Sequence, residues 1–391
     1  MSLYKMVELG TLIQQAKTVR CGSDDYPILS MTMHDGLVFQ DDKFKKIIAS
    51  KDRSDYKVVK RNQLVISFPI DEGVLAAQRI VDAGIVSPAY SIWDIDQEKI
   101  LPEFLEYALR CDRALSYYKA KLRGSTARRR SLPTPTLLAF TVPLPGVSEQ
   151  QFVLDVIHKA RKIIDNRSEE IQQLDNLVKA RFVEMFGIYP SNQMGWETGK
   201  IRDTVADVRY GSSRPAVDGG KYPYLRMNNI TYGGELDLSD VKRIDVPENE
   251  LDKCTVRRGD VLFNRTNSKE LVGKTCVYDR DEMMVLAGFV IRVRVNDRVL
   301  PEFLSAFLNT DFSKKTLSEM CKAAIGQANI NAQEMQNIGL YLPPLELQRQ
   351  FVQFKKQVDK SKVVESIHRM NVLFNITLNG GNRYDIRANE F

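Results

Sequence analysis

The sequence predicts a mixed α/β protein with two similar domains, each followed by a long helix. The chain has 391 residues, more than the ~250–300 that one hydrophobic core usually serves, so two domains are expected. The stretch LPEFLEYALRCD, which starts at Leu101, is nearly repeated as LPEFLSAFLNTD, which starts at Leu300. Internal similarity indicates the architecture of a chain, so this pair directs the assignment of the other elements.

Three further pairs of motifs recur in the same order. They are YPILSM (from Tyr26) with YPYLRM (from Tyr222), VVKRNQLVISF (from Val58) with TVRRGDVLFNR (from Thr255), and PGVSEQQFV (ending at Val153) with PLELQRQFV (ending at Val352). The offset between the members of each pair is nearly constant. The chain is therefore predicted to contain two copies of one unit of roughly 195–200 residues.

Composition narrows the class of protein. Hydrophobic residues make up 43% of the chain and charged residues 27%, which is ordinary for a globular protein. The net charge of +6 is compatible with a nucleic-acid partner without requiring one. The five cysteines are dispersed, which favours reduced thiols over a zinc site. We find no signal peptide and no apolar window of ~18 residues, and we expect a soluble cytoplasmic protein.

Each copy is predicted to run through the same elements. An early strand leads through a basic turn to an apolar segment, and a later strand precedes a short amphipathic helix opened by Leu-Pro-Glu. The proline stands at the first helical turn, where its missing N–H costs nothing. A polar loop then leads to a final strand. The expected strands are Ile28–Met31, Gln63–Phe68, Ala89–Trp93 and Thr141–Pro145 in the first copy, and Tyr224–Met227, Asp260–Phe263, Phe289–Val295 and Gly339–Pro344 in the second.

The segment between the copies is predicted to be one helix from Glu149 to Met185. It is rich in helix formers, with Ser148 as the expected N-cap and Gly187 as the expected C-cap. Its apolar residues recur at seven-residue spacing, which favours a coiled coil. The predicted seam consists of Ile157, Ile164, Ile171, Leu174, Val178 and Met185. A helix of about 55 Å requires an equally long partner.

A second, shorter helix follows the second copy and supplies that partner. Its predicted seam includes Phe351 and Val358, and its register is poorer than that of the first helix. The turn signal Asn379-Gly380-Gly381 lies beyond its expected end at residue 374. The predicted division of the chain is domain 1 over 1–145, the first helix over 146–187, domain 2 over 188–343, the second helix over 344–374, and an atypical tail over 375–391.

The polar loops are the candidate binding sites. Arginine clamps phosphate or reads guanine through two hydrogen bonds, whereas amide side chains read adenine. Turn formation or simple exposure is the alternative role, at about even odds. The candidates before the final strands are Ser125, Thr126, Arg128, Arg129 and Arg130 in the first copy, and Gln327, Asn329 and Asn331 in the second. Further candidates are Lys60, Arg61, Arg226, Asn228, Asn229, Asn264, Arg265, Asn267 and Lys269.

The stretch SKELVGKT, from Ser268 to Thr275, ends like a phosphate-binding P-loop. However, Ser268 stands where the tight turn of that motif needs its first glycine. We therefore expect a structural loop, in which Lys274 is a candidate for contact with the phosphate backbone of DNA.

Catalytic patterns are not found in the chain. The three histidines have no metal-ligand spacing, and neither an Asn/Asp-Pro-Pro-Tyr tetrad nor a dinucleotide glycine fingerprint occurs. We predict no catalytic residue, no metal ligand and no cofactor in this chain. Two alternatives stay open: a stand-alone methyltransferase or nuclease, and a coiled-coil scaffold with two adaptor domains that does not bind DNA.

The order of domain, long helix, domain and shorter helix resembles the specificity (S) subunit, HsdS, of Type I restriction–modification systems. The resemblance covers nearly the whole chain to about residue 365. The motifs that carry it are LPPLELQRQFV (342–352), PLPGVSEQQFV (143–153), LDNLVKARFVEMFG (174–187), RGSTARRRSL, RRGDVLFNRTNS, LVGKT and AAIGQANINAQEM. The C-terminus departs from the family, because the ending of the first helix does not recur after roughly Ser366.

This resemblance implies a function and a set of partners. Two target-recognition domains would alternate with helices that pair antiparallel in a pseudo-twofold arrangement, and they would read a bipartite, asymmetric DNA target. The chain would be a non-catalytic subunit that recruits methyltransferase (M) subunits, two of them expected, which bring S-adenosylmethionine. Restriction (R) subunits that use ATP and Mg²⁺ would complete the nuclease, and the complex would act in a prokaryotic cytoplasm at the nucleoid.

Overall fold

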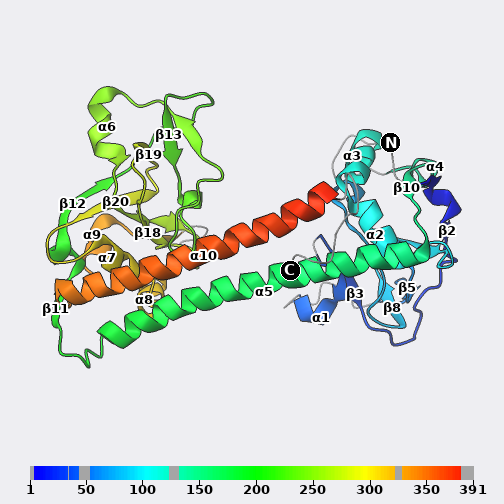
Figure 1. Cartoon of the computed structure of the whole chain (residues 1–391), viewed down its shortest axis with the longest axis horizontal. Helices are drawn as coiled ribbons and strands as arrows, with labels where there is room; N and C mark the ends of the chain where they lie inside the picture. The colour runs from blue at the N-terminus through cyan, green and yellow to red at the C-terminus, as the bar shows by residue number, and fades with distance from the viewer. Residues whose placement is uncertain (1–3, 34, 44–52, 123–131, 322–327, 380–391) are drawn as a thin grey trace. The chain divides into compact units, whose positions relative to one another are not determined.

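The computed structural model describes residues 4–33, 35–43, 53–122, 132–321 and 328–379 (Figure 1). In the last helix, side chains are described as far as Val363. The chain divides into two compact units, Met1–Lys162 (unit 1) and Ile163–Phe391 (unit 2).

Unit 1 is built from short strands and short helices. Its main sheet has the order β2-β9-β6-β7, with antiparallel neighbours throughout. The strands are β2 (Ile13–Gln15), β9 (Ser91–Ile95), β6 (Leu64–Ile66) and β7 (Leu75–Ala77). The paired strands around it are β3 (Leu29–Thr32) with β4 (Gly36–Phe39), β5 (Lys57–Lys60) with β8 (Ala83–Val86), and β1 (Met6–Glu8) with β10 (Thr141–Pro143). A parallel bridge from Ile28 to Ile85 joins the first two of these pairs.

Most helices of unit 1 pack on the core of the main sheet, whereas the short helix α1 packs on β4. The helices are α1 (Gln40–Lys43), α2 (Pro102–Arg110), α3 (Asp112–Lys121) and α4 (Thr134–Leu138), with the 3-10 helices η1 (Leu9–Thr11) and η2 (Ile70–Glu72). Leu64, Trp93, Leu105 and Tyr118 are buried together in this core. The hydrophobic effect therefore holds the predicted Leu-Pro-Glu helix, α2, against the sheet.

Unit 2 has the same strand order as unit 1. Its main sheet is β12 (Val205–Tyr210), β20 (Val290–Val295), β16 (Val261–Asn264) and β18 (Thr275–Val277), in that order. Its second sheet is β14 (Lys242–Ile244), β13 (Tyr222–Leu225), β19 (Met284–Leu286) and β15 (Thr255–Val256), in which β13 and β19 are parallel as β3 and β8 are in unit 1. The other pairs are β11 (Glu197–Lys200) with β22 (Gly339–Leu342), and β17 (Thr266–Asn267) with β21 (Ala328–Asn329). The predicted mixed α/β fold with a duplicated domain is confirmed.

The helices of unit 2 also follow the order in unit 1. They are α6 (Glu248–Cys254), α7 (Pro301–Leu308), α8 (Asp311–Met320) and α9 (Ala332–Gln336), with the 3-10 helices η4 (Ile201–Thr204) and η5 (Met227–Asn229). The second Leu-Pro-Glu motif opens α7 with its proline at the first position, as the first motif opens α2. A proline is tolerated there because the first turn of a helix has no partner for its N–H groups.

Gln150 anchors the start of the long helix α5 (Val147–Phe186) to unit 1. Its Oε1 accepts a hydrogen bond from the backbone N–H of Leu101 at 2.8 Å, and its Nε2 donates to the carbonyls of Lys99 and Pro145, each at 2.9 Å. The side chain is fully buried. One amide therefore joins the helix start to the turn before α2.

Gln348 repeats this anchor at the start of the second long helix, α10 (Leu345–Asn379). Its Oε1 accepts from the backbone N–H of Leu300 at 2.8 Å, and its Nε2 donates to the carbonyls of Arg298 at 3.2 Å and Pro343 at 2.8 Å. This side chain is also fully buried. The Leu-Pro-Glu helix is thus repeated together with the glutamine that ties a long helix to it.

The two anchors also correct the predicted alignment of the helix starts. Because Gln150 and Gln348 are equivalent, Val153 corresponds to Phe351, and the predicted match of Val153 with Val352 is wrong by one residue. Phe351 is fully buried, whereas Phe152 is 50% exposed. The letters QFV occur in both motifs, but they fall on different faces of the two helices, and burial decides which residues are equivalent.

Helix α5 begins one residue before its expected N-cap. The N–H groups of Glu149 and Gln150 both donate to the carbonyl of Gly146 at 2.9 Å, so Ser148 lies within the first turn and is not the cap. The predicted C-cap is confirmed: Gly187 has φ +81° and its N–H donates to the carbonyl of Val183 at 2.8 Å. A left-handed residue at this position commonly ends a helix, and glycine adopts it without strain.

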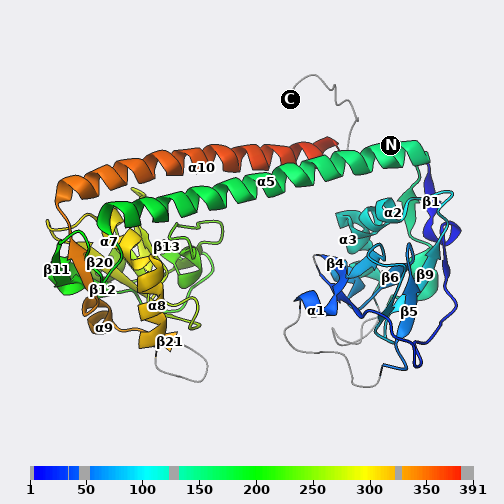
Figure 2. The same cartoon turned by 90° about the horizontal axis from the view of Figure 1, so that it is seen from below.

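Helix α10 runs antiparallel to the second half of α5, as Figure 2 shows. The Phe351 ring lies 5.3 Å from that of Phe182, the Arg181 guanidinium lies 5.9 Å from the Phe354 ring centre, and Lys362 forms an ion pair with Asp175. Later residues of α10 thus meet earlier residues of α5. The predicted antiparallel pairing is confirmed within unit 2. Helix α10 also continues to Asn379, beyond the expected end at residue 374.

The predicted seam is only part of the packing surface of these helices. Ile164, Ile171, Leu174, Val178 and Met185 are half-buried, Val358 is buried, and Ile157 packs on the core of unit 1. The most buried residues of α5 in unit 2 are Phe182 and Phe186, which the heptad pattern missed. A straight helix drifts by ~20° per heptad, so a strict seven-residue count loses the buried face toward the helix end.

Candidate nucleic-acid interface

Several predicted candidates lie outside the described residues. They are Ser125, Thr126, Arg128, Arg129, Arg130 and Gln327. The other candidates are placed by the structure, and they fall into groups with different environments.

Two predicted polar segments of unit 2 meet in space. The chain leaves β16 at Asn264 and continues into β17, which pairs antiparallel with β21. In this pairing Thr266 stands opposite Asn329, and the Thr266 hydroxyl donates to the Asn329 Oδ1 at 2.9 Å. The segment FNRTNSK and residues 328–331, which are far apart in the sequence, therefore form one surface.

Arg265 and the exposed Lys269 are the cations of this surface, and neighbouring residues hold Arg265 in place. Its guanidinium carbon lies 5.0 Å from the centre of the Tyr210 ring, at the end of β12. Its backbone is fixed on both sides, because its N–H donates to the carbonyl of Phe289 at 3.0 Å and its carbonyl accepts from Ile330 at 2.9 Å. Tyr210 is 44% exposed and Phe289 53% exposed. Sequence reasoning missed both aromatic residues, since nothing local distinguishes them from core aromatics.

The amide residues around Arg265 have different roles. Asn331 caps α9, because its Oδ1 accepts from the N–H of Glu334 at 2.9 Å and Glu334 accepts from the N–H of Asn331 at 2.9 Å. Asn267 is half-buried and accepts from the N–H of Ser268 at 2.9 Å. Asn264 is fully buried, and neither polar atom of its side chain has a hydrogen-bond partner among the described residues. Contact chemistry at this surface therefore falls mainly to Arg265, which is half-buried, and to Asn329, which is exposed.

The RMNN motif belongs to a separate group. Arg226 forms an ion pair with Asp240 at 2.7 Å, and the Asn229 amide donates to the carbonyls of Asp237 and Asp240 at 2.8 and 3.0 Å. These bonds hold the segment between η5 and β14 in place. Asn228 is the exposed residue of the motif.

Lys274 lies within the fold of unit 2. It is buried, its Nζ donates to the carbonyl of Met227 at 2.8 Å, and burial lowers its pKa. Its counterpart in unit 1 is Val74, which is also buried and has no side-chain group that could donate a hydrogen bond. This placement favours the structural loop that the sequence predicted. Lys269, on the same loop, is exposed.

Unit 1 has different side chains at the place of Arg265. Ile66 pairs with Ser91 as Phe263 pairs with Ile291. Ser67 therefore corresponds to Asn264, the last residue of β16, and Phe68 corresponds to Arg265. The equivalence is supported by the N–H groups of Ser67 and Asn264, which donate to Val74 and Lys274 at 3.0 and 2.8 Å. Phe68 is 54% exposed. One scaffold thus presents an apolar ring in unit 1 and a guanidinium in unit 2.

The basic turn of unit 1 is only partly available for contacts. Lys60 is exposed at the end of β5. Arg61 donates from Nε to the Asp82 carboxylate at 3.0 Å and from Nη1 to the carbonyl of Arg79 at 2.6 Å, so its guanidinium braces the turn.

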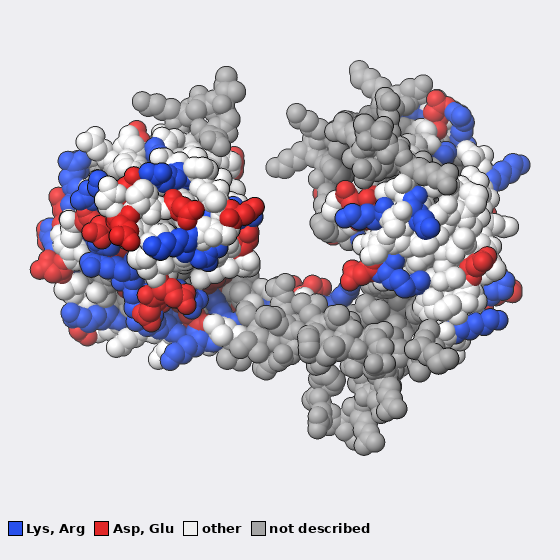
Figure 3. All heavy atoms as spheres, turned by 90° about the horizontal axis from the view of Figure 1, so that it is seen from above, with Lys and Arg blue, Asp and Glu red and all other residues white. Residues whose placement is uncertain are grey.

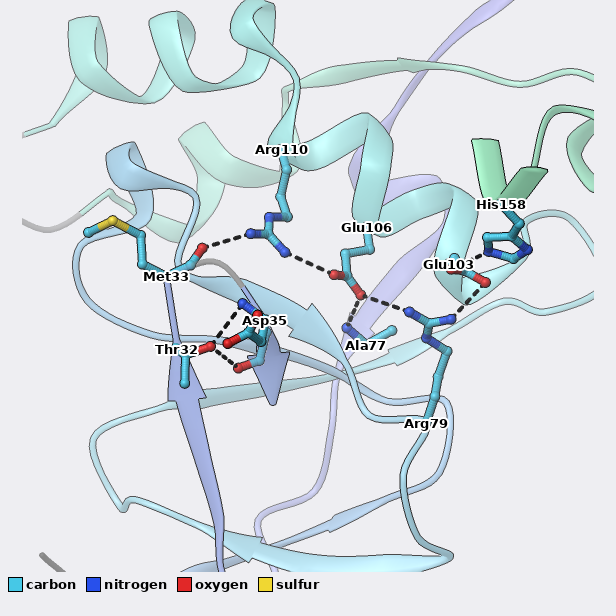
Figure 4. A network of polar contacts seen from close by, with 10 residues as sticks. Thr32, Met33, Asp35, Ala77, Arg79, Glu103, Glu106, Arg110 and His158 are labelled. Atoms are coloured by element: carbon cyan, nitrogen blue, oxygen red, sulfur yellow. Dashed lines mark hydrogen bonds and ion pairs between the residues drawn. The ribbon is translucent and has the colours of Figure 1, made fainter. Parts of the chain in front are cut away.

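A polar network connects α5 to unit 1 (Figure 4). The Glu103 carboxylate, on α2, forms an ion pair with Arg79 at 2.7 Å and a hydrogen bond with His158 of α5 at 2.8 Å. Burial acts to raise the pKa of Glu103, but the hydrogen bond from His158 and the charge of Arg79 outweigh it and lower that pKa. Glu106 joins the same network through Arg79 at 3.8 Å and is also paired with Arg110 at 3.1 Å. The charged form of Glu103 therefore helps to hold the first turns of α5 on unit 1.

The surface of each unit carries both signs of charge. Figure 3 shows Lys and Arg interspersed with Asp and Glu among the described residues on the face that it presents. Within the described part of the chain, no group of three or more His, Cys, Asp or Glu side chains is placed to hold a metal ion. No helix that the structure describes is long and apolar enough to cross a membrane.

Comparisons with known proteins match this architecture. Residues 194–370 match the family model described as the Type I restriction modification DNA specificity domain. The chain is 22% identical to the Type I restriction enzyme EcoKI specificity subunit of Escherichia coli K12 over 233 residues, which cover 56% of this chain and 50% of that protein. It is 26% identical to the putative type I restriction enzyme MjaX specificity subunit of Methanocaldococcus jannaschii over 168 residues, 42% of this chain and 39% of that protein. The chain thus spans about half the length of these curated relatives.

The fold is also shared with a solved protein. A chain from a study of complex assembly and conformational transition of the type I R-M system superposes with a TM-score of 0.59. Its sequence is 18% identical, and the match covers 95% of each chain. Two similar units joined by a long helix are therefore a fold that this chain shares with that protein. Residues 194–370 carry the Type I restriction modification DNA specificity domain, and the predicted resemblance to type I specificity subunits is confirmed.

Proposed function

We propose that this chain is the DNA-reading subunit of a type I restriction–modification complex. The main support for the proposal is that the two units share one scaffold but present different side chains at the same position. The main sheets of the two units have the same strand order. At the equivalent position next to the end of β6 and β16, however, unit 1 has Phe68 and unit 2 has Arg265. Two such surfaces suit a target with two different half-sites.

The chain itself would be non-catalytic and would bind no cofactor. It would recruit two M subunits, which would supply S-adenosylmethionine for methylation, and R subunits, which would use ATP and Mg²⁺. The mixed surface charge supports a role for this chain in selective DNA recognition. A net charge of +6 provides only modest attraction to DNA, so selectivity must come from a few exposed side chains.

Methylation mapping tests the proposal directly. The full chain is co-expressed with the M subunit encoded beside its gene in a host without modification, and methylated bases are mapped across the genome. We expect one bipartite motif with two unlike halves and an unread spacer, and no methylation when either protein is expressed alone. Methylation by the chain alone, or co-purification with M without any sequence preference, would contradict the proposal.

A further inference from the structure

Arg265 differs from most arginines of unit 2 in having a free charge. Many of the others are paired with carboxylates, as Arg209 and Arg292 are with Asp207 and Arg226 is with Asp240. Among the described residues, Arg265 forms no ion pair, and its buried Nε–H has no acceptor. A cation without a counter-ion retains its capacity to bind an acceptor from another molecule.

The surroundings of Arg265 orient its guanidinium. The stack on Tyr210 restricts the plane of the group, and the Tyr210 hydroxyl accepts from the N–H of Ala332 at 2.9 Å, which connects the ring to the start of α9. The backbone bonds to Phe289 and Ile330 fix the Cα position. A planar group held in this way loses little conformational entropy on binding, which suits a contact that needs two parallel hydrogen bonds.

The neighbouring side chains favour a base edge over a phosphate as the acceptor. Tyr210 lies against the Arg265 guanidinium, the Phe289 carbonyl accepts from the Arg265 N–H, and both aromatic residues are exposed. The Asn329 amide lies on the adjacent strand pair. Phosphate cradles gather several cations and backbone N–H groups, whereas base readers are single arginines and amides among apolar contacts. Two acceptors on one base edge, N7 and O6 of guanine, match the fork of an arginine.

We propose that Arg265, held by Tyr210, reads a guanine in the half-site that unit 2 recognises. The inference rests on the proposed function and makes it specific to one base pair. Arg265 is the specificity-determining residue and Tyr210 is its positioning residue. At the equivalent place in unit 1, Phe68 has no hydrogen-bonding group, so the other half-site is read there without this guanine contact.

The test is a change of motif by Arg265→Gln in the full chain with its M subunit. Glutamine pairs with adenine, so we expect the requirement for guanine to be lost or replaced by adenine at one position of one half-site, with the other half-site unchanged. Discrimination at that position should fall by roughly 5- to 140-fold, the range of one bidentate pair. Tyr210→Leu should relax the same position by a smaller factor, and Tyr210→Phe, which keeps the ring, should largely retain the guanine requirement.

Arg258→Gln is the matched control, because it removes the same charge from an exposed arginine that is paired with Asp281. It should leave the motif unchanged. If Arg265→Gln abolishes methylation, the affinity of the variant complex is measured for DNA duplexes that carry a base-pair substitution at each motif position in turn. These affinities show whether discrimination is lost at one position only. An equal loss on all duplexes, or an unchanged motif, overturns guanine reading. If the unmutated complex methylates no defined motif, the proposed function itself is contradicted, and this outcome is distinct from a failure of guanine reading.

Discussion

Lys314, on α8, shows how the fold changes the ionisation of one side chain. Its Nζ donates to the carbonyl of Gly273 at 3.0 Å and lies 5.2 Å from the centre of the Tyr232 ring. Burial lowers the pKa of Lys314 from 10.5 to about 8, and repulsion from Lys179 and Lys274 acts in the same direction. Folding therefore costs free energy when this amine is protonated.

We expect Lys314→Met to increase the free energy of unfolding near neutral pH. Between pH 8 and the ordinary lysine pKa of 10.5, the unfolded chain binds more protons than the folded chain, so the stability of the parent rises with pH in that range. The advantage of the variant is then largest below pH 8 and small near pH 10. Urea unfolding at several pH values measures it, with the exposed neighbour Lys315→Met as control. An advantage independent of pH would contradict this account.

The contribution of the Gln348 side chain to the anchor of α10 can be tested by a single substitution. Gln348→Met keeps the volume of the side chain but leaves the Leu300 N–H and the Pro343 carbonyl without a partner. An unsatisfied buried polar group costs about 1–3 kcal/mol, so the free energy of unfolding should fall by an amount in that range. Chemical denaturation measures the change, and Gln350→Met, on the exposed side of the helix start, should have little effect. Equal effects of the two variants would refute the anchor.

At the scale of elements, Lys362 joins three parts of unit 2. Its ammonium is paired with Asp175 of α5, with Glu235 of the loop before β14 at 3.0 Å, and with Asp359 of α10 at 3.5 Å. The carboxylates raise the pKa of Lys362 even though its burial acts to lower it. The Lys362 side chain is 11% exposed, whereas that of Glu235 is 54% exposed, so solvent screens part of the network.

We expect Lys362→Met to loosen α10 from α5 without unfolding unit 2. Asp175 and Glu235 would then lose their shared cation while Asp359 keeps Lys355, at a cost of about 1–2 kcal/mol after allowance for their exposure. Hydrogen–deuterium exchange should become faster in α10 around residue 362 and stay unchanged in the sheet around β16. Lys355→Met removes a cation that pairs only with Asp359 and should have a weaker effect. Unchanged exchange at α10 would show that apolar contacts alone hold the helix.

For the whole molecule, the proposed function relates helix length to the spacer of the DNA target. Inserting seven residues into both α5 and α10 preserves the buried face of each helix and adds roughly 10 Å, or about three base-pair steps. The methylated motif should then keep both half-sites and gain a longer spacer. Mapping of methylated sites measures this, and an unchanged spacer with both halves retained would exclude a ruler role for the helices.

Local patterns were sufficient for much of the fold. The Leu-Pro-Glu helices, the strands of both copies and the glycine that ends α5 are visible in the sequence because their signals act within a few residues. The duplication was visible for a different reason, since two copies of a scaffold repeat the same buried positions. The error at Val153 and the missed Phe182 arose where packing against another element, and not helix period, decides which face is buried.

The candidate site was less accessible from the sequence. Arg265 was recognised as a candidate, but Tyr210 and Phe289 were not, because they come next to it only through pairing of strands that are distant in the chain. Asn229, Asn331 and Lys274 have the composition of contact residues, yet they satisfy hydrogen bonds inside the fold. The sequence by itself determined the duplicated architecture and the resemblance to type I specificity subunits, since both depend on patterns along the chain. Only the tertiary structure decided which polar groups remain available to a partner, because that depends on which of them the fold has already paired.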